Sequence, residues 1–282
     1  MTVTCGDFEI THIVGARYRW DGGVFFGVVP KTMWSRKFPA DDLNRIRVAV
    51  NSYVVRTGHH TVLIETGIGD KPDSRARERM DLPANHDPLP AIIARHGIDP
   101  EQIDVVINSH LHFDHCGGNT RLSPEGPKPE FPRARYFASR PEWEHAHERH
   151  PRDSISYLDE NYDPLVDSGR MILVPGDTEV VPGIRMLCVP GHNRDMMVVK
   201  VESAGHTFCF LSDLVPTIAH VQPTWIAAVD LFPLTAIDKK MEWLTAAKEG
   251  KWLCAFAHDP DVGFASIVHD EKTRFRGEPR PA

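Results

Sequence analysis

The stretch His110-Leu111-His112-Phe113-Asp114-His115 decides what this chain can bind and how it folds around the bound group. Imidazole nitrogen and carboxylate oxygen are the ligand atoms that suit zinc and similar divalent metals. In an extended backbone His110 and His112 point the same way, because side chains on a strand repeat every second residue. The adjacent Asp114 and His115 then diverge, which would serve a second metal ion nearby.

The residues around this stretch place it where a strand ends. Val105-Val106-Ile107-Asn108 is a short apolar run typical of a buried strand, and Gly117-Gly118 follows the histidines. A polar surface loop with incidental histidines would not need this tight exit from a strand. The context therefore favours a metal site over an incidental cluster.

Three more ligand-type residues each stand just past an apolar, strand-like run: His192 after 185–189, Asp213 after 207–211 and His258 after 253–257. Sheets in α/β proteins place their active sites at the carboxyl ends of strands. Taken alone, His192 could be a capping or core histidine. The other two residues and the histidine stretch together favour a ligand.

Composition and charge limit the class of protein. A chain of 282 residues with 41% hydrophobic and 25% charged residues is typical of a globular protein with a sizeable core. The formal net charge of −7 argues against nucleic acid, which is bound through clustered Lys and Arg. The apolar runs are too short for a membrane span, and no signal peptide is recognisable at the N-terminus. We therefore expect a small-molecule partner, with no nucleic acid and no membrane.

The cysteines indicate the compartment. Five is an odd number for a disulfide framework, and Cys188, Cys209 and Cys254 lie in apolar, strand-like runs where a free thiol behaves as a small hydrophobe. Free thiols fit a reducing compartment. The expected location is the cytoplasm.

The coarse pattern along the chain is a series of strands with helices between some of them. Strands are predicted at 8–16, 46–56, 61–65, 105–108, 171–174, 185–189, 197–201, 207–211 and 253–257, and helices at 91–95, 141–149 and 236–249. Because no linker interrupts the pattern, we expect one layered α/β domain over residues 1–282. The polar, Pro-containing end from Arg274 to Ala282 is expected to be a loose tail.

Residues 20–45 form a long predicted connection with exposed-looking apolar residues. Phe26 and Trp34 could line the apolar wall of a substrate pocket, since small-molecule sites combine such walls with a few polar groups. His220, in a predicted loop after Asp213, could contact the same substrate. The alternatives are a homodimer contact or simple packing for the segment, and an ordinary loop residue for His220.

The pattern resembles the metallo-β-lactamase superfamily, whose hallmark is H-x-H-x-D-H followed by a distant His, Asp and His. The resemblance runs from about Ile46 to His258, which is most of the chain. It implies a four-layer αβ/βα sandwich with the metal site along one edge of the two sheets. Carried over position by position, it implies a first metal held by His110, His112 and His192, a second held by Asp114, His115 and His258, and Asp213 bridging the two.

Seven ligands favour a centre of two divalent ions, most simply Zn2+, although such ligands also accept Mn2+, Fe2+ or Co2+. Two departures from the family pattern concern the surroundings of the metals. Glu65-Thr66-Gly67 stands where the family often has Asp-Thr-Gly, and Glu65 would there support a ligand histidine. Gly191-His192-Asn193-Arg194 keeps the ligand histidine but lacks a second histidine that many hydrolases of the family carry.

The resemblance implies hydrolysis by a hydroxide shared between two metal ions, because coordination lowers the pKa of water toward neutrality. Asp114 would orient this nucleophile and pass a proton to the leaving group. The chain is similar to the lactonase and esterase branch, so a small ester or lactone is the expected substrate. Pro216 stands where those lactonases often carry Tyr, three residues after Asp213, and leaves the substrate open.

Other activities on the same scaffold stay open as alternatives. The same hydroxide could attack a phosphotriester. Thioesterases share the ligands but carry a helical C-terminal region, and only 24 residues follow His258. From a different class, an iron-dependent sulfur dioxygenase or a non-catalytic metal-binding module would use the same scaffold, and the complete ligand set favours catalysis over the last.

Overall fold

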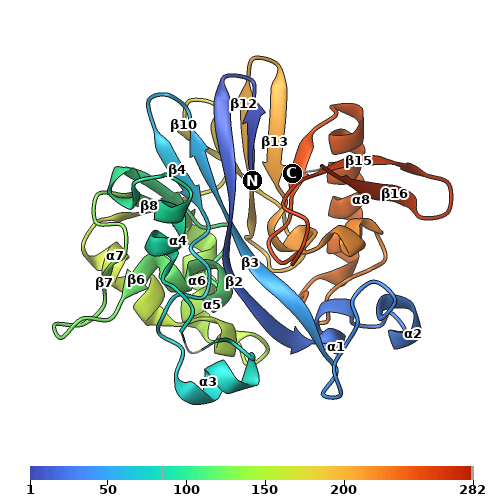
Figure 1. Ribbon diagram of the computed structural model, residues 1–282, viewed down its shortest axis with the longest axis horizontal. Helices are drawn as coiled ribbons and strands as arrows, with labels where there is room; N and C mark the ends of the chain where they lie inside the picture. The colour runs from blue at the N-terminus through green and yellow to red at the C-terminus, as the bar shows by residue number, and fades with distance from the viewer. Residues whose placement is uncertain (84, 281–282) are drawn as a thin grey trace.

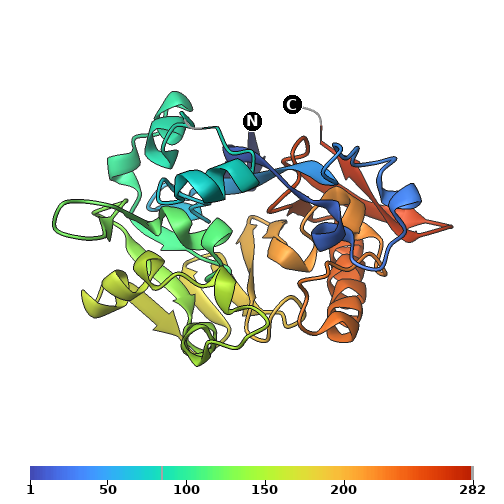
Figure 2. The ribbon, with the colours of Figure 1, turned by 90° about the horizontal axis from the view of Figure 1, so that it is seen from below.

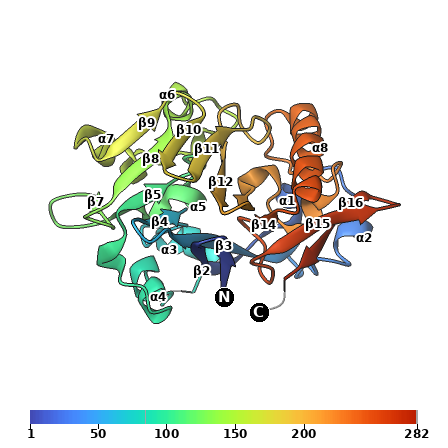
Figure 3. The same ribbon diagram turned by 90° about the horizontal axis from the view of Figure 1, so that it is seen from above.

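Two facing β-sheets with helices on their outer sides make up the computed structural model, which describes residues 1–83 and 85–280. Figures 1 and 3 show the strands between two groups of helices: α4 (Leu89–Arg95), α6 (Arg140–Glu148) and α7 (Asp163–Asp167) on one side, α8 (Pro233–Glu249) on the other. Among these residues no helix combines the length and the apolar character needed to cross a bilayer.

The first sheet contains the strand that precedes the histidine stretch, and its strand order is β1-β2-β3-β4-β5-β8-β9. Its members are β1 (Thr2–Cys5), β2 (Phe8–Asp21), β3 (Arg45–Arg56), β4 (Thr61–Ile64), β5 (Val105–Ile107), β8 (Arg135–Ser139) and β9 (Met171–Val174). Neighbours from β1 to β4 pair antiparallel, and those from β4 to β9 pair parallel. The long β2–β3 ribbon runs across the molecule toward the side of α8 (Figure 1).

The second sheet carries the more distant ligand-type residues, in the order β10-β11-β12-β13-β14-β15-β16. Its members are β10 (Thr178–Val181), β11 (Ile184–Cys188), β12 (Met197–Ser203), β13 (His206–Phe210), β14 (Leu253–Ala255), β15 (Ala265–Asp270) and β16 (Arg274–Pro279). β13 and β14 pair parallel, and the other neighbours pair antiparallel.

Alternation of side chains along the central strands explains the layers. In β5, Val105 and Ile107 join the core between the sheets, whereas Val106 joins the core under the outer helices. In β13, Phe208 belongs to the core between the sheets, and Cys209 packs toward α8. Each sheet therefore has two buried faces. The predicted four-layer αβ/βα sandwich is confirmed.

The end of the chain corrects one prediction. Residues 274–279 are not a loose tail but strand β16, which pairs antiparallel with β15. Phe275 anchors this strand, because it is 2% exposed and packs in the same core as α8. The strand carries charged residues, Gly277 and Pro279 around this single apolar residue, as edge strands often do, so the sequence gives no clear alternation. Residues 281–282 lie outside the described residues.

Residues 20–45 are not one long connection, which is a second correction. The segment contains α1 (Gly22–Phe26) and α2 (Lys31–Trp34) before β3 begins. Other short elements that periodicity does not reveal are β1, β10, β15, β6 (Thr120–Arg121), β7 (Lys128–Pro129), α3 (Ser74–Arg79) and α5 (Phe113–Cys116). Elements of two to six residues are too short for a measurable period.

The loops after the parallel strands meet at one edge of the sandwich, which Figure 2 shows from below. Ser109 follows β5 and Ser212 follows β13, and their hydroxyl oxygens lie 2.7 Å apart. His258, after β14, donates its backbone N–H to Pro216 and accepts from Ala49 of β3. These bonds tie both sheets together at the place where the ligand-type residues lie.

Candidate metal centre

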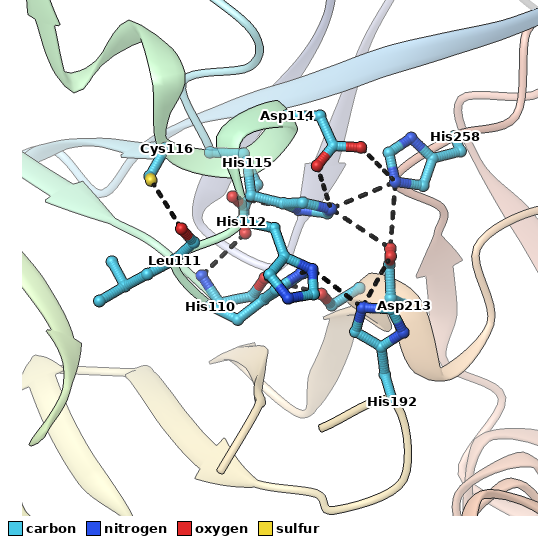
Figure 4. A network of polar contacts seen from close by, with 12 residues as sticks. His110, Leu111, His112, Asp114, His115, Cys116, His192, Asp213 and His258 are labelled. Carbon is cyan, nitrogen blue, oxygen red and sulfur yellow. Dashed lines mark hydrogen bonds and ion pairs between the residues drawn. The ribbon is translucent and has the colours of Figure 1, made fainter. Parts of the chain in front are cut away.

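The seven ligand-type side chains converge at this edge (Figure 4). Five are imidazoles that are at most 9% exposed, and the two carboxylates, Asp114 and Asp213, have side chains that are 18% and 11% exposed. All seven come from loops or short helical turns that directly follow strands β5, β11, β13 and β14. The structure therefore brings together every residue that the sequence proposes as a metal ligand.

The first group consists of His110, His112 and His192. The Nδ1 atom of His112 lies 3.1 Å from Nε2 of His110 and 3.2 Å from Nε2 of His192. Ligands about 2.0–2.1 Å from a tetrahedral metal stand about 3.3 Å apart, so these spacings fit one ion among three nitrogens.

The second group consists of Asp114, His115 and His258. The Nε2 atoms of the two histidines lie 3.2 Å apart. One oxygen of Asp114 lies 3.9 Å from His115 Nε2 and the other lies 3.8 Å from His258 Nε2. This group has the composition and spacing of a second ion site beside the first.

Asp213 lies between the two groups (Figure 4). Its Oδ1 is 3.2 Å from His258 Nε2 in the second group, and its Oδ2 is 3.6 Å from His192 Nε2 in the first. The preceding Ser212 has a φ of 50°, a left-handed backbone conformation that a non-glycine residue adopts only when its surroundings enforce it. The Ser109–Ser212 contact supplies such a constraint, so the strained turn aims Asp213 into the centre.

The electrostatics of His110, His112 and Asp213 favour a bound cation. Burial and the neighbouring imidazoles hold the pKa of His110 and His112 well below the usual value, so both are neutral, which is the metal-binding form. Burial alone would raise the pKa of Asp213, but His258 and His115 hold it well below the usual range. Among residues 1–83 and 85–280, Asp213 Oδ1 is buried without a hydrogen-bond donor, which is costly unless a positive charge faces it.

Three ligand histidines have a partner for the ring nitrogen that faces away from the centre. His192 Nδ1 donates to Asp230 Oδ1 at 2.9 Å, and His258 Nδ1 donates to the Ala49 carbonyl at 2.9 Å. His110 Nδ1 lies 3.0 Å from the hydroxyl of Ser109. Such contacts fix the tautomer and the ring orientation of metal-binding histidines.

Glu65 lies behind the second group, near the position that the resemblance implies. Its Oε2 is 3.5 Å from His115 Nδ1, and its Oε1 accepts the backbone N–H of Ser109 at 2.8 Å. Glu65 has a φ of 63°, so the backbone turns sharply as it leaves β4. The carboxylate thus contacts both a ligand ring and the loop that carries the first two ligands.

Glu142 of α6 is a supporting residue that the sequence does not reveal. Its Oε1 accepts from the Tyr157 hydroxyl at 2.9 Å, the Asn193 amide at 3.0 Å and the Leu111 N–H at 3.3 Å. It therefore ties the loop of His110 and His112 to the loop of His192. Burial raises its pKa to about 7. An acid in the first turn of a polar helix carries no sequence signal for this role, and neither does Asp230.

A pocket opens onto the centre, and its lining corrects another prediction. The residues around it are Tyr18, Trp20, Val24, Phe25, His112, Phe113, Asp114, Ser156, His192, Asp213, Pro216, Ala227, Val229 and His258. Phe26, Trp34 and His220 are not among them. The wall residues from α1 are Val24 and Phe25, and the ring centroid of Phe25 lies 5.6 Å from that of His258.

Phe26, Trp34 and His220 instead form a buried stack. The Phe26 ring lies 5.1 Å from Trp34 and 5.0 Å from His220, nearly parallel to both. His220 Nε2 donates to the Phe25 carbonyl at 2.7 Å, so it holds the wall without lining it. Periodicity could not tell Phe25 from Phe26, because α1 has only five residues. Val28 remains 93% exposed, and a homodimer contact there stays a prediction.

Comparison with known proteins agrees with this geometry. A family model described as the metallo-β-lactamase superfamily matches residues 45–258. An N-acyl homoserine lactonase of Bacillus cereus is 29% identical over 57% of this chain and 62% of its own length. The match thus spans less than two thirds of that relative. An N-acyl homoserine lactonase of Agrobacterium fabrum is 26% identical over 86% of this chain and 91% of its own.

Solved structures give the same fold. A probable metal-dependent hydrolase from Staphylococcus aureus has a TM-score of 0.90 and 27% identity, over 99% of both chains. A dizinc quorum-quenching lactonase has a TM-score of 0.80 and 19% identity, over 100% of this chain and 97% of its own, and shows the fold alone. Since the family model covers most of the chain and includes all seven ligand-type residues, the chain belongs to the metallo-β-lactamase superfamily.

Proposed function

We propose that this protein is a two-metal hydrolase that cleaves a small ester or opens a lactone. The observation that carries the proposal is the position of Asp213. Its Oδ1 faces His258 at 3.2 Å and its Oδ2 faces His192 at 3.6 Å, which are members of different ligand groups. A carboxylate in this position would bridge two cations and reduce the repulsion between them.

The proposed ligands of one ion are His110, His112 and His192, those of the other are Asp114, His115 and His258, and Asp213 is shared by both. Two divalent ions held by these residues, most simply Zn2+, would supply a water of lowered pKa as nucleophile and would polarise the substrate carbonyl. Two carboxylates offset only half of the ions' charge. The centre therefore stays positive and attracts a carbonyl oxygen.

Asp114 is the proposed proton carrier. It lines the pocket, and its side chain is 18% exposed, so Oδ2 can contact both the attacking water and the bound substrate. The carboxylate accepts one proton from the water and returns it to the leaving oxygen. Water and an ester then yield an acid and an alcohol, and a lactone yields a hydroxy acid.

The substrate class is supported by the relatives and by the pocket wall. The relatives from Bacillus cereus and Agrobacterium fabrum are named N-acyl homoserine lactonases. The wall includes Trp20, Val24 and Phe25, which suit an uncharged organic group beside the polar centre. A small molecule, not a nucleic acid, is the proposed partner of this acidic chain.

The test is a screen of the metal-loaded protein against lactones, aryl esters, thioesters and phosphotriesters. We expect the fastest turnover with a lactone or an aryl ester, and loss of turnover after chelation. Turnover that consumes molecular oxygen would indicate the sulfur dioxygenase alternative. Inactivity on all four classes with two metals bound would contradict the proposal.

We also propose that the protein works in the reducing cytoplasm. Cys209 of β13 and Cys254 of β14 are register neighbours in the parallel pair, yet both are free thiols. Free thiols are typical of reducing compartments. Localisation of a tagged full chain checks this proposal, and export from the cell would contradict it.

A further inference from the structure

Tyr18 is a buried tyrosine that faces the candidate metal centre. It lies near the end of β2, is 4% exposed, and lines the pocket with Asp114 and Asp213. A bulge between Val14 and Ala16 precedes it, and bulges re-aim the side chains of the residues that follow. Strand β2 thus brings the Tyr18 hydroxyl to a centre whose ligand-type residues come from loops later in the chain.

The hydroxyl of Tyr18 differs from those of the other four tyrosines. Each of those makes a hydrogen bond of 3.0 Å or less: Tyr53 to the Gly263 carbonyl at 2.8 Å, Tyr157 to Glu142 at 2.9 Å, Tyr162 to Asp159 at 2.9 Å, and Tyr136 from the Phe131 N–H at 3.0 Å. Within the described residues the Tyr18 hydroxyl has one contact, Asp114 Oδ2 at 3.5 Å. That distance is at the outer limit for a hydrogen bond.

The single contact of Tyr18 is also needed elsewhere. The two oxygens of Asp114 lie 3.9 Å from His115 Nε2 and 3.8 Å from His258 Nε2, in the second ligand group. An acid that binds a cation is a weaker acceptor for a distant hydroxyl. Buried hydroxyls normally have a hydrogen-bond partner, so the Tyr18 donor is available to an oxygen of a molecule in the pocket.

We propose that Tyr18 is a catalytic residue whose hydroxyl donates a hydrogen bond to the substrate oxygen that gains negative charge during hydrolysis. This inference rests on the proposed function. The Tyr18 ring packs in a buried cluster and meets the Trp20 ring at 6.2 Å, so the donor is held in place before the reaction. The proton stays on the phenol throughout, and the hydroxyl stabilises charge without transferring a group.

The experiment compares Tyr18→Phe with the wild type, both as full-length, zinc-loaded protein, on 4-nitrophenyl acetate and δ-valerolactone. Loss of one preorganised donor is expected to lower kcat by about 100-fold, with KM little changed. Phe keeps the packing of the ring, so the thermal midpoint and the metal content should match the wild type. A purely structural role would not lower kcat alone.

Tyr53→Phe is the matched control, because it also removes a buried phenol hydroxyl, here from the core between the sheets. It should lower stability and leave kcat unchanged. Equal kcat for Tyr18→Phe and wild type, or a kcat loss that follows metal loss, would overturn the inference alone. A zinc-loaded wild type that hydrolyses neither these two substrates nor any other lactone, ester, thioester or phosphotriester of the screen would overturn the proposed function and this inference with it.

Discussion

The candidate metal centre and the pocket wall beside it are held in place in different ways. In the centre, directional polar contacts fix the rings: Asp230 holds His192 at 2.9 Å, and the Ala49 carbonyl holds His258 at 2.9 Å. Such bonds weaken steeply with distance and angle. A ligand ring therefore has one orientation, and a change behind it is transmitted to the metal site.

The wall depends instead on packing between apolar surfaces. Phe26 stacks between Trp34 and His220. One hydrogen bond, from His220 to the Phe25 carbonyl, fixes the position of the His220 ring in this stack. Cores of this kind tolerate substitutions that conserve volume. Substitutions in the centre should therefore change metal binding and catalysis, whereas substitutions in the wall should change stability and substrate binding.

The largest effect is expected from Asp213→Asn. The change removes the charge that faces both ligand groups while it keeps the size of the side chain. Metal content should fall, and kcat should drop by at least about 1000-fold, since the metals supply several kcal/mol of transition-state stabilisation. Elemental analysis and steady-state kinetics check both. Wild-type activity in this variant would contradict the bridging role.

Asp230→Asn tests the support behind one ring. Since Asp230 accepts from His192 of the first group, affinity for the first ion should fall by about 10–100-fold while the second ion stays bound. Asp153→Asn is the matched control, because Asp153 accepts from His145 at 2.8 Å outside the centre. Zinc titration against a chelating dye separates the two variants. Equal loss of both ions would count against distinct groups.

The pair Phe25→Ala and Phe26→Ala tests the two sides of the wall. Phe25 lines the pocket, so its removal should raise KM with metal content intact. Phe26 is fully buried, so its removal should cost about 3–5 kcal/mol of unfolding free energy and leave KM nearly unchanged. Kinetics and denaturant unfolding check the pair. The reverse pattern would contradict the corrected wall assignment.

The smallest effect on catalysis is expected at Lys240, a buried lysine of α8 close to the wall. Its Nζ donates to the carbonyls of Trp225 at 2.6 Å and Gln222 at 3.2 Å, and burial lowers its pKa from 10.5 to about 7, against the opposing effect of Asp230. The folded state thus favours the neutral amine. Its contribution to stability is present above pH 10.5 and is lost as the pH falls to about 7.

Lys240→Met removes this titration. The unfolding free energy of the wild type should fall relative to the variant by at most about 1.4 kcal/mol per pH unit between pH 10.5 and about 7, and the difference should then stay constant. Urea unfolding across this range measures the difference. A difference that does not change with pH would contradict the neutral state of Lys240.

The convergence of the seven ligand-type residues could be predicted because each follows an apolar strand. Strand ends are local features, and parallel strands bring their carboxyl ends to one edge, as His110 and Asp213 illustrate. The layered fold could be predicted for the same reason, from apolar runs such as Val105–Ile107 with two buried faces. The H-x-H-x-D-H stretch at residues 110–115 makes both predictions, of the fold and of the ligand-type residues, much more specific.

The remaining features could not be predicted because they depend on tertiary contacts. Glu142 reaches Asn193 across 51 residues of chain, and Tyr18 reaches Asp114 across 96. Phe275 anchors a strand whose other residues are polar, Gly or Pro, so no alternation marks it. In each case the partner is chosen by packing and not by a local pattern.

The central claim is that the seven side chains form one centre for two ions, with Asp213 shared between them. The most direct measurement is the number of zinc ions per chain in the purified, zinc-loaded protein, determined together with turnover of a lactone. The account predicts two ions per chain and activity that appears only when the second ion binds. Full activity with one ion per chain, or no binding at all, would contradict it.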